Sequence, residues 1–144
     1  MHEFFKPDVM TPRLPPWVLV VFIFFILAVQ ISALYWHLYF YIRWLDIPVH
    51  ILGGMWIALF GLATYYASAH IKEKEHSVFF VFLFAVALTM TIGLGWELYE
   101  FGVDHAVGDT GAGLADTLLD LTNDLIGALI AALLFIRLGY HKKA

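Results

Sequence analysis

Four long hydrophobic runs constrain this chain more than any other feature of its sequence. They cover about residues 17–42, 49–69, 78–101 and 114–137. A helix needs about 20 mainly apolar residues to cross the roughly 30 Å hydrocarbon core of a bilayer, and every run meets that length. β-Strands fit poorly, because the runs lack alternation and lipid offers no partner to an open sheet edge. We therefore predict an all-α bundle of four transmembrane helices in a single integral membrane domain.

The composition of the chain also favours the bilayer as its solvent. Hydrophobic residues make up 62% and charged residues 14% of its 144 residues, against about 45–50% and about 25% in ordinary globular domains. A water-soluble domain of this size has no interior large enough for that apolar share. A net charge of −4 with only eight Lys and Arg residues argues against nucleic acid as a partner. The absence of cysteine excludes disulfides and thiolate metal ligands.

The basic residues predict how the four spans are oriented. If the spans alternate in direction, all Lys and Arg residues except Arg43 share one side of the membrane. The positive-inside rule then places both termini in the cytoplasm. The first run exceeds the roughly 7–15-residue core of a signal peptide, so we expect it to be retained as a span. An interfacial aromatic girdle is expected at its outer end: Tyr35, Trp36, Tyr39, Tyr41 and Trp44.

Acidic residues gather in the outer parts of the second, third and fourth spans. Each set has helical spacing and therefore lies along one helix face. The sets are Asp46 with His50, Glu97 with Glu100, and Asp116 with Asp120 and Asp124. With a rise of about 1.5 Å per residue, His50 and Glu97 lie about 28 Å above the cytoplasmic helix ends. The same rise puts Asp120 about 24 Å and Asp124 about 18 Å up.

So many carboxylates inside one bundle need a compensating charge. An ionised carboxylate in the middle of a helix in lipid costs about 3 kcal/mol, and Arg43 is the only Lys or Arg expected on that side. Protonation or a water-filled cavity would also relieve the cost, but a divalent ion is the simplest neutraliser. Oxygen-rich sites bind Mg²⁺, Mn²⁺ or Ca²⁺, and a carboxylate–His cluster also suits Zn²⁺ or a di-iron pair. Di-iron ranks low because the chain lacks the two Glu-x-x-His motifs of di-iron bundles.

Depth in the membrane and residue type select the candidate metal ligands. The expected inner ligands are His50, Glu97, Asp120 and Asp124. The outer or alternate ligands are Asp46, Glu100, Asp116 and Asn123. Asp46 also has a structural alternative as a helix N-cap before Ile47-Pro48, and Asp116 suits the positive end of a helix dipole. Asp120 and Asp124 have no such alternative, because their short side chains cannot reach the interface.

Small residues predict where the helices pack closely. They are Gly53, Gly54, Ala58 and Gly61 in the second span and Gly93 and Gly95 in the third. The glycine-rich segment 102–113 is expected to be an outer loop. Its charged residues, which are Asp104, His105 and Asp109, are then solvated, or they form a second, looser cation site or a lid.

The motifs resemble those of the VanZ-like membrane proteins and the related YjdF-type inner-membrane proteins over about residues 46–128. The matching segments are Asp46-x-x-x-His50 with Gly53-Gly54, Gly95-Trp96-Glu97-Leu98-Tyr99-Glu100, Gly108-Asp109, Asp116-Thr117-x-x-Asp120 and Asn123-Asp124-x-x-Gly127-Ala128. Tyr99-Glu100 stands where several VanZ-type members carry Gln, and the glycine-rich loop replaces an Arg, which favours the YjdF side. The resemblance implies a multi-pass protein of a bacterial or archaeal cytoplasmic membrane, with its site on the extracytoplasmic side.

The predicted function is divalent-metal binding in a pocket that opens to the outer face. As an enzyme, the protein would use the metal for hydrolysis or transfer on a lipid or lipid-linked phosphate, with Glu100 as general base. One alternative is a permeation element in which Asp116, Asp120 and Asp124 exchange protons or cations. Another is a structural subunit whose acids meet basic residues of a partner. Membrane lipids and a lipid-linked substrate are the expected partners, and the sequence is compatible with a homo-oligomer.

Overall fold

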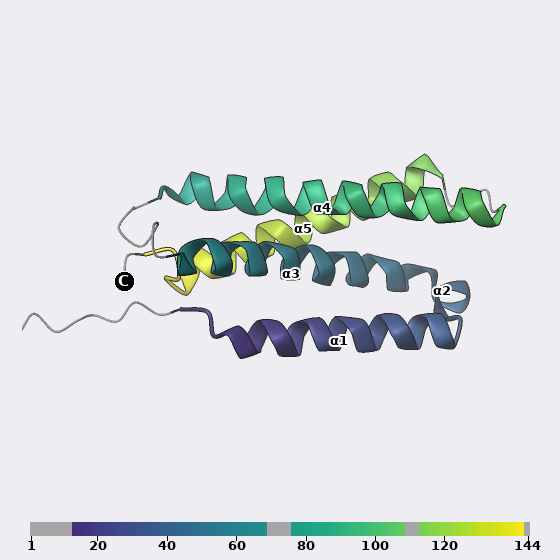
Figure 1. Ribbon diagram of the computed structural model, residues 1–144, viewed down its shortest axis with the longest axis horizontal. Coiled ribbons are helices and arrows are strands. Elements are labelled where there is room, and N and C mark those ends of the chain that lie inside the picture. Colours follow the sequence, from purple (N-terminus) through teal and green to yellow (C-terminus); the bar gives the residue numbers. More distant parts are fainter. Residues whose placement is uncertain (1–12, 69–75, 109–112, 143–144) are drawn as a thin grey trace, which may run out of the picture.

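The computed structural model describes residues 13–68, 76–108 and 113–142, and these residues form helices and turns without a strand. Four of the helices are long and apolar enough to cross a membrane, which confirms the predicted architecture. They are α1 (Pro16–Tyr35), α3 (Asp46–Ala67), α4 (Val78–Val107) and α5 (Leu114–Arg137). A short helix α2 (Leu38–Tyr41) and a 3₁₀ turn η1 (Arg43–Leu45) connect α1 to α3 (Figure 1).

The first span is shorter than the apolar run that predicts it. α1 ends at Tyr35 rather than near residue 42, because His37 has a left-handed backbone conformation with a φ of 53°, which cannot continue a right-handed helix. The chain then turns back, and the Tyr39 hydroxyl donates a hydrogen bond to Oε1 of Gln30 in α1. Tyr39 is half-buried, whereas the other four residues of the predicted aromatic girdle are exposed.

The third span is longer than predicted. α4 continues to Val107, past the expected end at residue 101, and Gly108 closes it with a φ of 78°, a conformation that glycine adopts readily. Asp104 and His105 therefore lie in the last turn of a helix, which corrects their assignment to a loop. Asp109 lies outside the described residues.

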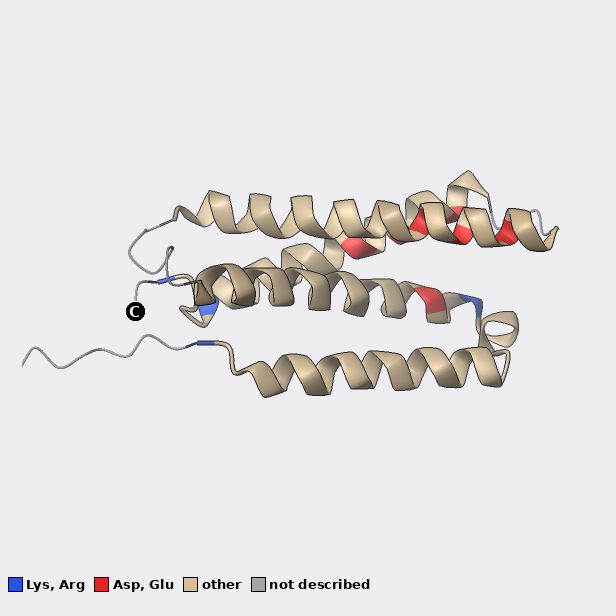
Figure 2. Ribbon diagram, in the orientation of Figure 1, with Lys and Arg blue, Asp and Glu red and all other residues tan. Residues whose placement is uncertain are grey.

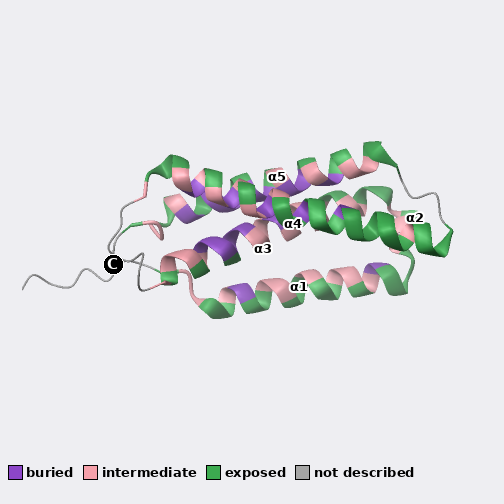
Figure 3. Cartoon of the chain, turned by 45° about the horizontal axis from the view of Figure 1, so that its top comes forward, coloured by how far each residue is buried: buried purple, intermediate pink, exposed green. Residues whose placement is uncertain are grey.

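α3 and α5 form the central helix pair of the bundle. They share the most extensive interface, α4 packs against both, and α1 packs mainly on α3. Buried residues accordingly lie on the facing sides of α3, α4 and α5, while α1 is mostly exposed or half-buried (Figure 3). The Trp56 indole of α3 donates a hydrogen bond to the Leu19 carbonyl oxygen of α1 at 2.8 Å. Three helices thus share one core, and α1 lies against one of them.

Two glycines explain why α3 and α5 approach so closely. A Cβ atom on Gly54 would lie 2.8 Å from the Asp124 Cα, and a Cβ atom on Gly127 would lie 2.7 Å from the Met55 backbone nitrogen. Neither position has room for a side chain, so the two backbones are in direct contact there. This contact places the residues of α5 immediately beside the first turns of α3.

The other predicted packing positions have mixed outcomes. Ala58 is fully buried, and a Cβ atom on Gly61 would collide with the Leu88 side chain of α4, as close packing requires. Gly53 and Gly95 have no atoms within 4 Å of such a Cβ atom, so their assignment to helix contacts is wrong. Glycine in a span therefore does not by itself identify a helix contact.

The half of the core away from the acids is filled by apolar side chains. Leu62 of α3, Val81 and Ala85 of α4, and Ala131 and Phe135 of α5 are 0–1% exposed. Lipid tails are as apolar as these residues, so close packing, rather than release of water, holds them together. This part of the described core is apolar and lies toward the end of the bundle away from the acidic residues.

Gly54→Ala is expected to destabilise the protein in detergent, because the added methyl group collides with the α5 backbone. We expect the free energy of unfolding to fall by about 2 kcal/mol or more. Thermal unfolding followed by circular dichroism measures the change. The matched control is Gly53→Ala, where open space and a better helix propensity leave stability equal or higher by up to about 1 kcal/mol. Equal stability of the two variants would contradict the direct backbone contact.

Candidate metal centre

Acidic side chains gather toward one end of the bundle. Figure 2 shows Asp and Glu on α3, α4 and α5 toward the end at which α2 lies, and Lys and Arg mostly at the opposite end. We call these the acidic end and the basic end. The described acids are Asp46, Glu97, Glu100, Asp104, Asp116, Asp120 and Asp124. The described residues thus separate their charges along the bundle axis.

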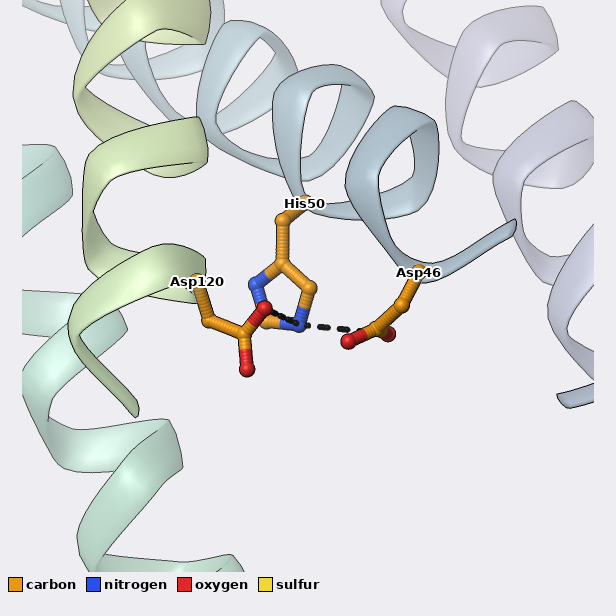
Figure 4. Close-up of side chains that lie close together, drawn as sticks. All are labelled: Asp46, His50 and Asp120. Carbon is orange, nitrogen blue, oxygen red and sulfur yellow. Dashed lines mark ion pairs between the residues drawn. The ribbon is translucent and has the colours of Figure 1, made fainter. Parts of the chain in front are cut away.

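The imidazole of His50 lies at the centre of this acidic cluster. Its Nε2 is 3.6 Å from Oδ1 of Asp46 and 3.7 Å from Oδ1 of Asp120 (Figure 4). Its Nδ1, the other ring nitrogen, is 3.4 Å from Oδ1 of Asp124. One imidazole therefore faces three carboxylates, which come from α3 and α5.

Helical spacing explains how these groups meet. Residues i and i+4 are neighbours on a helix surface, so α3 presents Asp46 with His50, and α5 presents Asp120 with Asp124. Asp46 is the first residue of α3, and no side chain caps the start of that helix. The N-cap alternative for Asp46 is therefore wrong, and its carboxylate turns to His50 instead.

The acids that α5 contributes are shielded inside the protein. Asp120 is 3% exposed and Asp124 is 5% exposed, while the His50 side chain between them is 12% exposed. Oδ1 of Asp120 has no hydrogen-bond partner among the described residues. A buried carboxylate oxygen without a partner is costly, so a cation bound beside it would be strongly stabilised.

The side chains of Asp46, His50 and Asp120 have the spacing of a set of metal ligands. One ligand atom each from Asp46, His50 and Asp120 lies within 4.8 Å of the other two. Atoms bound to one ion at about 2.1 Å lie about 3–4 Å apart, so small side-chain shifts bring all three onto one ion. Two carboxylates also cancel the charge of a divalent cation. The role of these residues as ligands stays a prediction.

Asp124 holds a different position from the other two acids. Its Oδ1 faces Nδ1 of His50, and its Oδ2 lies against the α4 backbone at Gly93, where a Cβ atom would collide with it. Gly93 thus makes room for this carboxylate between α4 and the imidazole. In many metal sites a carboxylate contacts the second ring nitrogen of a ligating His and fixes its tautomer and direction. Asp124 is placed for that role.

The remaining predicted site residues lie around this centre. Glu97 of α4 is 8% exposed, and neither its Oε1 nor Nδ2 of Asn123 has a hydrogen-bond partner among the described residues. No ion pair joins Glu97 to His50 within the described part of the chain. Asp116 and Glu100 line the cavity that opens beside the imidazole. The structure therefore brings all the predicted residues to one end, but only some of them into contact.

A cavity of about 670 Å³ lies between α1, α3, α4 and α5. Its polar lining includes two residues of the candidate centre, Asp46 and His50, but not Asp120. The other polar lining residues are Gln30, Tyr39, Arg43, Glu100, Asp116 and Asp124. Its apolar lining comes from α1, α3 and α4 and consists of Ile26, Leu27, Leu34, Val49, Ile57, Ile92 and Trp96. The cavity thus joins a charged region to a hydrophobic one.

One family model covers almost the entire chain. The model of predicted membrane proteins named DUF2238 matches residues 9–141. The chain belongs to the DUF2238 family. Membership in a family of membrane proteins agrees with the four helices that are long enough to span a membrane. It does not identify the chain as a VanZ-like or YjdF-type protein. Comparisons with curated proteins and with solved structures give no match.

Three polar residues that line the cavity are not among the predicted site residues: Gln30, Tyr39 and Arg43. The sequence assigns Tyr39 to the aromatic girdle and gives Gln30 no role. Burial, followed by the charge of Asp46, raises the pKa of the Tyr39 hydroxyl above its ordinary value, so this group stays a hydrogen-bond donor. Of the three, Gln30 is the residue that the sequence indicates, because an amide inside an apolar span is costly unless it faces a polar partner.

His50→Gln is expected to destabilise the metal-free protein, because it leaves three carboxylates without the imidazole that faces them. We expect the free energy of unfolding in detergent with a chelator to fall by about 3 kcal/mol. The matched control is His105→Gln, which changes an exposed imidazole near the end of α4 and should stay within about 0.5 kcal/mol of the wild type. A loss no larger than that of the control would show that the cluster does not depend on His50.

Proposed function

We propose that this protein binds a divalent cation at Asp46, His50 and Asp120 and uses it on a lipid or lipid-linked phosphate. The observation that carries the proposal is the His50 ring, whose Nε2 faces the two carboxylates at 3.6 and 3.7 Å. This donor set fits a cation, because two carboxylates and one imidazole suit Zn²⁺ or Mn²⁺, and the oxygens also suit Mg²⁺ or Ca²⁺. Oδ1 of Asp120, the atom that faces Nε2 of His50, has no hydrogen-bond partner among the described residues and so is open to a cation.

In this proposal Asp124 orients His50 instead of ligating the ion. Its contact with Nδ1 at 3.4 Å leaves Nε2 to face the cation, as carboxylate–His–metal sites require. Glu97 is the candidate for a further ligand from α4, because its carboxylate is buried and Oε1 lacks a partner among the described residues. Asp116 is the corresponding candidate on the cavity side.

The cavity supports phosphate chemistry next to the centre. A divalent ion, when bound, polarises a phosphoryl oxygen and lowers the pKa of a bound water. Glu100 lines the same cavity and, as a carboxylate in reach of water there, accepts a proton as the general base. Asp46, His50 and Asp120 keep their positions through the direct contact of α3 with α5.

The shape of the cavity favours a lipid as the substrate. Its volume of about 670 Å³ lies within the usual range of about 300–1,000 Å³ for small-molecule sites. A phosphate headgroup suits the region of His50, and an acyl or isoprenyl chain suits the apolar lining from α1, α3 and α4. A water-soluble substrate would leave that apolar lining unused.

The structure disfavours the permeation alternative. A permeation pathway needs polar groups that continue from the acids to the basic end, where the sequence offers Thr64, Thr89 and Thr91. Each of these hydroxyls donates to a backbone carbonyl within the bundle, at 2.8, 3.4 and 2.7 Å respectively. The described core beyond them is apolar, with residues such as Leu62 and Phe135 at 0–1% exposure.

The structure also disfavours a role as a subunit whose acids pair with a partner. Asp120 and Asp124 are 3% and 5% exposed within this chain alone. A basic side chain of another protein would have to enter the cavity to reach Asp124, and Asp120 is not among the residues that line that cavity. Their compensation therefore has to come from inside the bundle.

We infer further that the protein lies in the cytoplasmic membrane of a bacterium or archaeon, with the acidic end at the extracytoplasmic face. The support is the distribution of charge, because Arg13, Arg137 and Lys142 flank the spans at the basic end, and cytoplasmic loops carry the excess of such residues. The resemblance of the site motifs to VanZ-like and YjdF-type proteins supports the same location.

Purified protein is expected to retain a near-stoichiometric divalent ion, and Asp120→Asn should lower the metal content about tenfold or more because one ligand charge is lost. Elemental analysis by mass spectrometry after gel filtration measures it, with Mg²⁺, Mn²⁺, Ca²⁺ and Zn²⁺ each supplied in turn. The control is Asp104→Asn, an acid of α4 outside the cavity lining, which should keep the wild-type content. Equal content in the wild type and in Asp120→Asn would remove the site.

Glu100→Gln is expected to lower turnover about 10²–10⁴-fold while the metal content stays unchanged, because only the general base is lost. Release of inorganic phosphate from phosphatidic acid and from an isoprenyl diphosphate in detergent micelles measures turnover. Asp104→Asn again serves as the control and should keep full activity. Activity of Glu100→Gln within a few-fold of the wild type would exclude Glu100 as the base.

A further inference from the structure

Arg43 is a charged group of the cavity that the candidate metal centre does not use. Among the described residues it is the only Lys or Arg at the acidic end, and it lines the same cavity as Asp46 and His50. Asp46 follows it by three residues, yet that carboxylate pairs with His50, and no ion pair joins Arg43 to any acid within the described part of the chain. Arg43 is exposed, so its guanidinium donors are accessible to a ligand in the cavity.

Gln30 and Tyr39 add neutral hydrogen-bonding groups to the lining of the same cavity. The Tyr39 hydroxyl donates to Oε1 of Gln30, so the amide NH₂ of Gln30 remains as a donor. Tyr39 keeps its proton at neutral pH, as an ordinary phenol does, and burial raises its pKa further. Tyr39 thus acts as a positioning residue: it holds the amide oxygen of Gln30 and leaves the amide NH₂ group to donate to a ligand.

We propose that Arg43 and Gln30, with Tyr39 positioning the amide, form a phosphate-binding subsite beside the metal centre, and that the ligand is the phosphate headgroup of a lipid. The proposal rests on the proposed function, since it names the part of the substrate that the cavity recognises. Arg is suited to this task, because its planar fork of N–H donors matches phosphate oxygens in pairs. The carboxylates of Asp46 and Asp120 repel a bare anion, so the subsite needs the positive charge of Arg43 on its own side.

The arrangement of α1 explains why the phosphate belongs to a lipid. α1 and α4 both contribute to the lining, through residues such as Leu27 and Ile92, but α1 packs mainly on α3 and has little contact with α4. The cavity therefore separates these two helices at the depth of the hydrocarbon core. A chain from the bilayer can enter between α1 and α4, while its headgroup stays near Arg43.

The test uses the full-length protein in detergent with dioctanoyl phosphatidic acid as the probe. Its dissociation constant is measured from tryptophan fluorescence, because Trp96 lines the cavity. Arg43→Gln should raise the dissociation constant about tenfold, as loss of one charged hydrogen-bonding group does, and Arg43→Lys should recover part of the affinity. Gln30→Leu should weaken binding by about threefold without a change of charge. The matched control is Arg137→Gln at the basic end, which should bind as the wild type does.

Two further probes identify the source of the phosphate. Dioctanoylglycerol, which has the same chains without the phosphate, should bind weakly and equally to the wild type and to Arg43→Gln. Inorganic phosphate should bind at least tenfold more weakly than the lipid, because it lacks the apolar contacts. Inorganic phosphate that binds as tightly as the lipid would overturn the lipid assignment.

The outcomes separate this inference from the proposed function. An unchanged dissociation constant in Arg43→Gln, or an equal loss in Arg137→Gln, overturns the subsite even if the metal content of both variants is that of the wild type. A wild-type protein without metal refutes the proposed function, whereas a dependence of lipid binding on Arg43 still supports the subsite. If Arg43→Gln does not fold, the wild type decides: added salt should weaken phosphatidic acid binding and leave dioctanoylglycerol binding unchanged, and equal responses overturn the subsite.

Discussion

The rest of this structure depends on how the bundle accommodates buried carboxylates in a medium that cannot solvate them. Asp120 and Asp124 are only 3% and 5% exposed, so neighbouring protein groups must replace most of the water that would otherwise stabilise them. His50 provides part of that stabilisation by facing carboxylates with both ring nitrogens. Gly54 and Gly127 are needed for these contacts, because α5 can approach α3 closely enough only where neither residue carries a side chain.

The sequence predicts the architecture well because span length and hydropathy leave no other fold for such a chain. It predicts the helix ends poorly, since the residues around His37 are apolar enough to continue a span, and only the backbone reversal there shows that α1 has ended. Spacing and depth also predict that His50 lies near Asp120 and Asp124. They cannot predict which ring nitrogen each acid faces, because that depends on how α3 and α5 are rotated about their axes.

The polar lining of the cavity outside the acidic cluster cannot be predicted from residue spacing within a helix. Gln30, Tyr39 and Arg43 come from three different elements, α1, α2 and η1, and they share a lining only because the chain folds back after α1. No periodicity within a single helix can indicate such a meeting. A polar residue inside an otherwise apolar span is the only local sign of it, and Gln30 is that sign in this chain.

The loose attachment of α1 divides the molecule into two parts that can evolve separately. All groups of the candidate cation site belong to the tightly packed helices, whereas α1 supplies apolar wall through side chains such as Ile26 and Leu34. Exchanging these residues for larger or smaller ones alters the width and depth of the wall without moving a carboxylate. Under the proposed function, such exchanges would change the tail length of the lipid that the cavity takes, while Asp46, His50 and Asp120 stay in place.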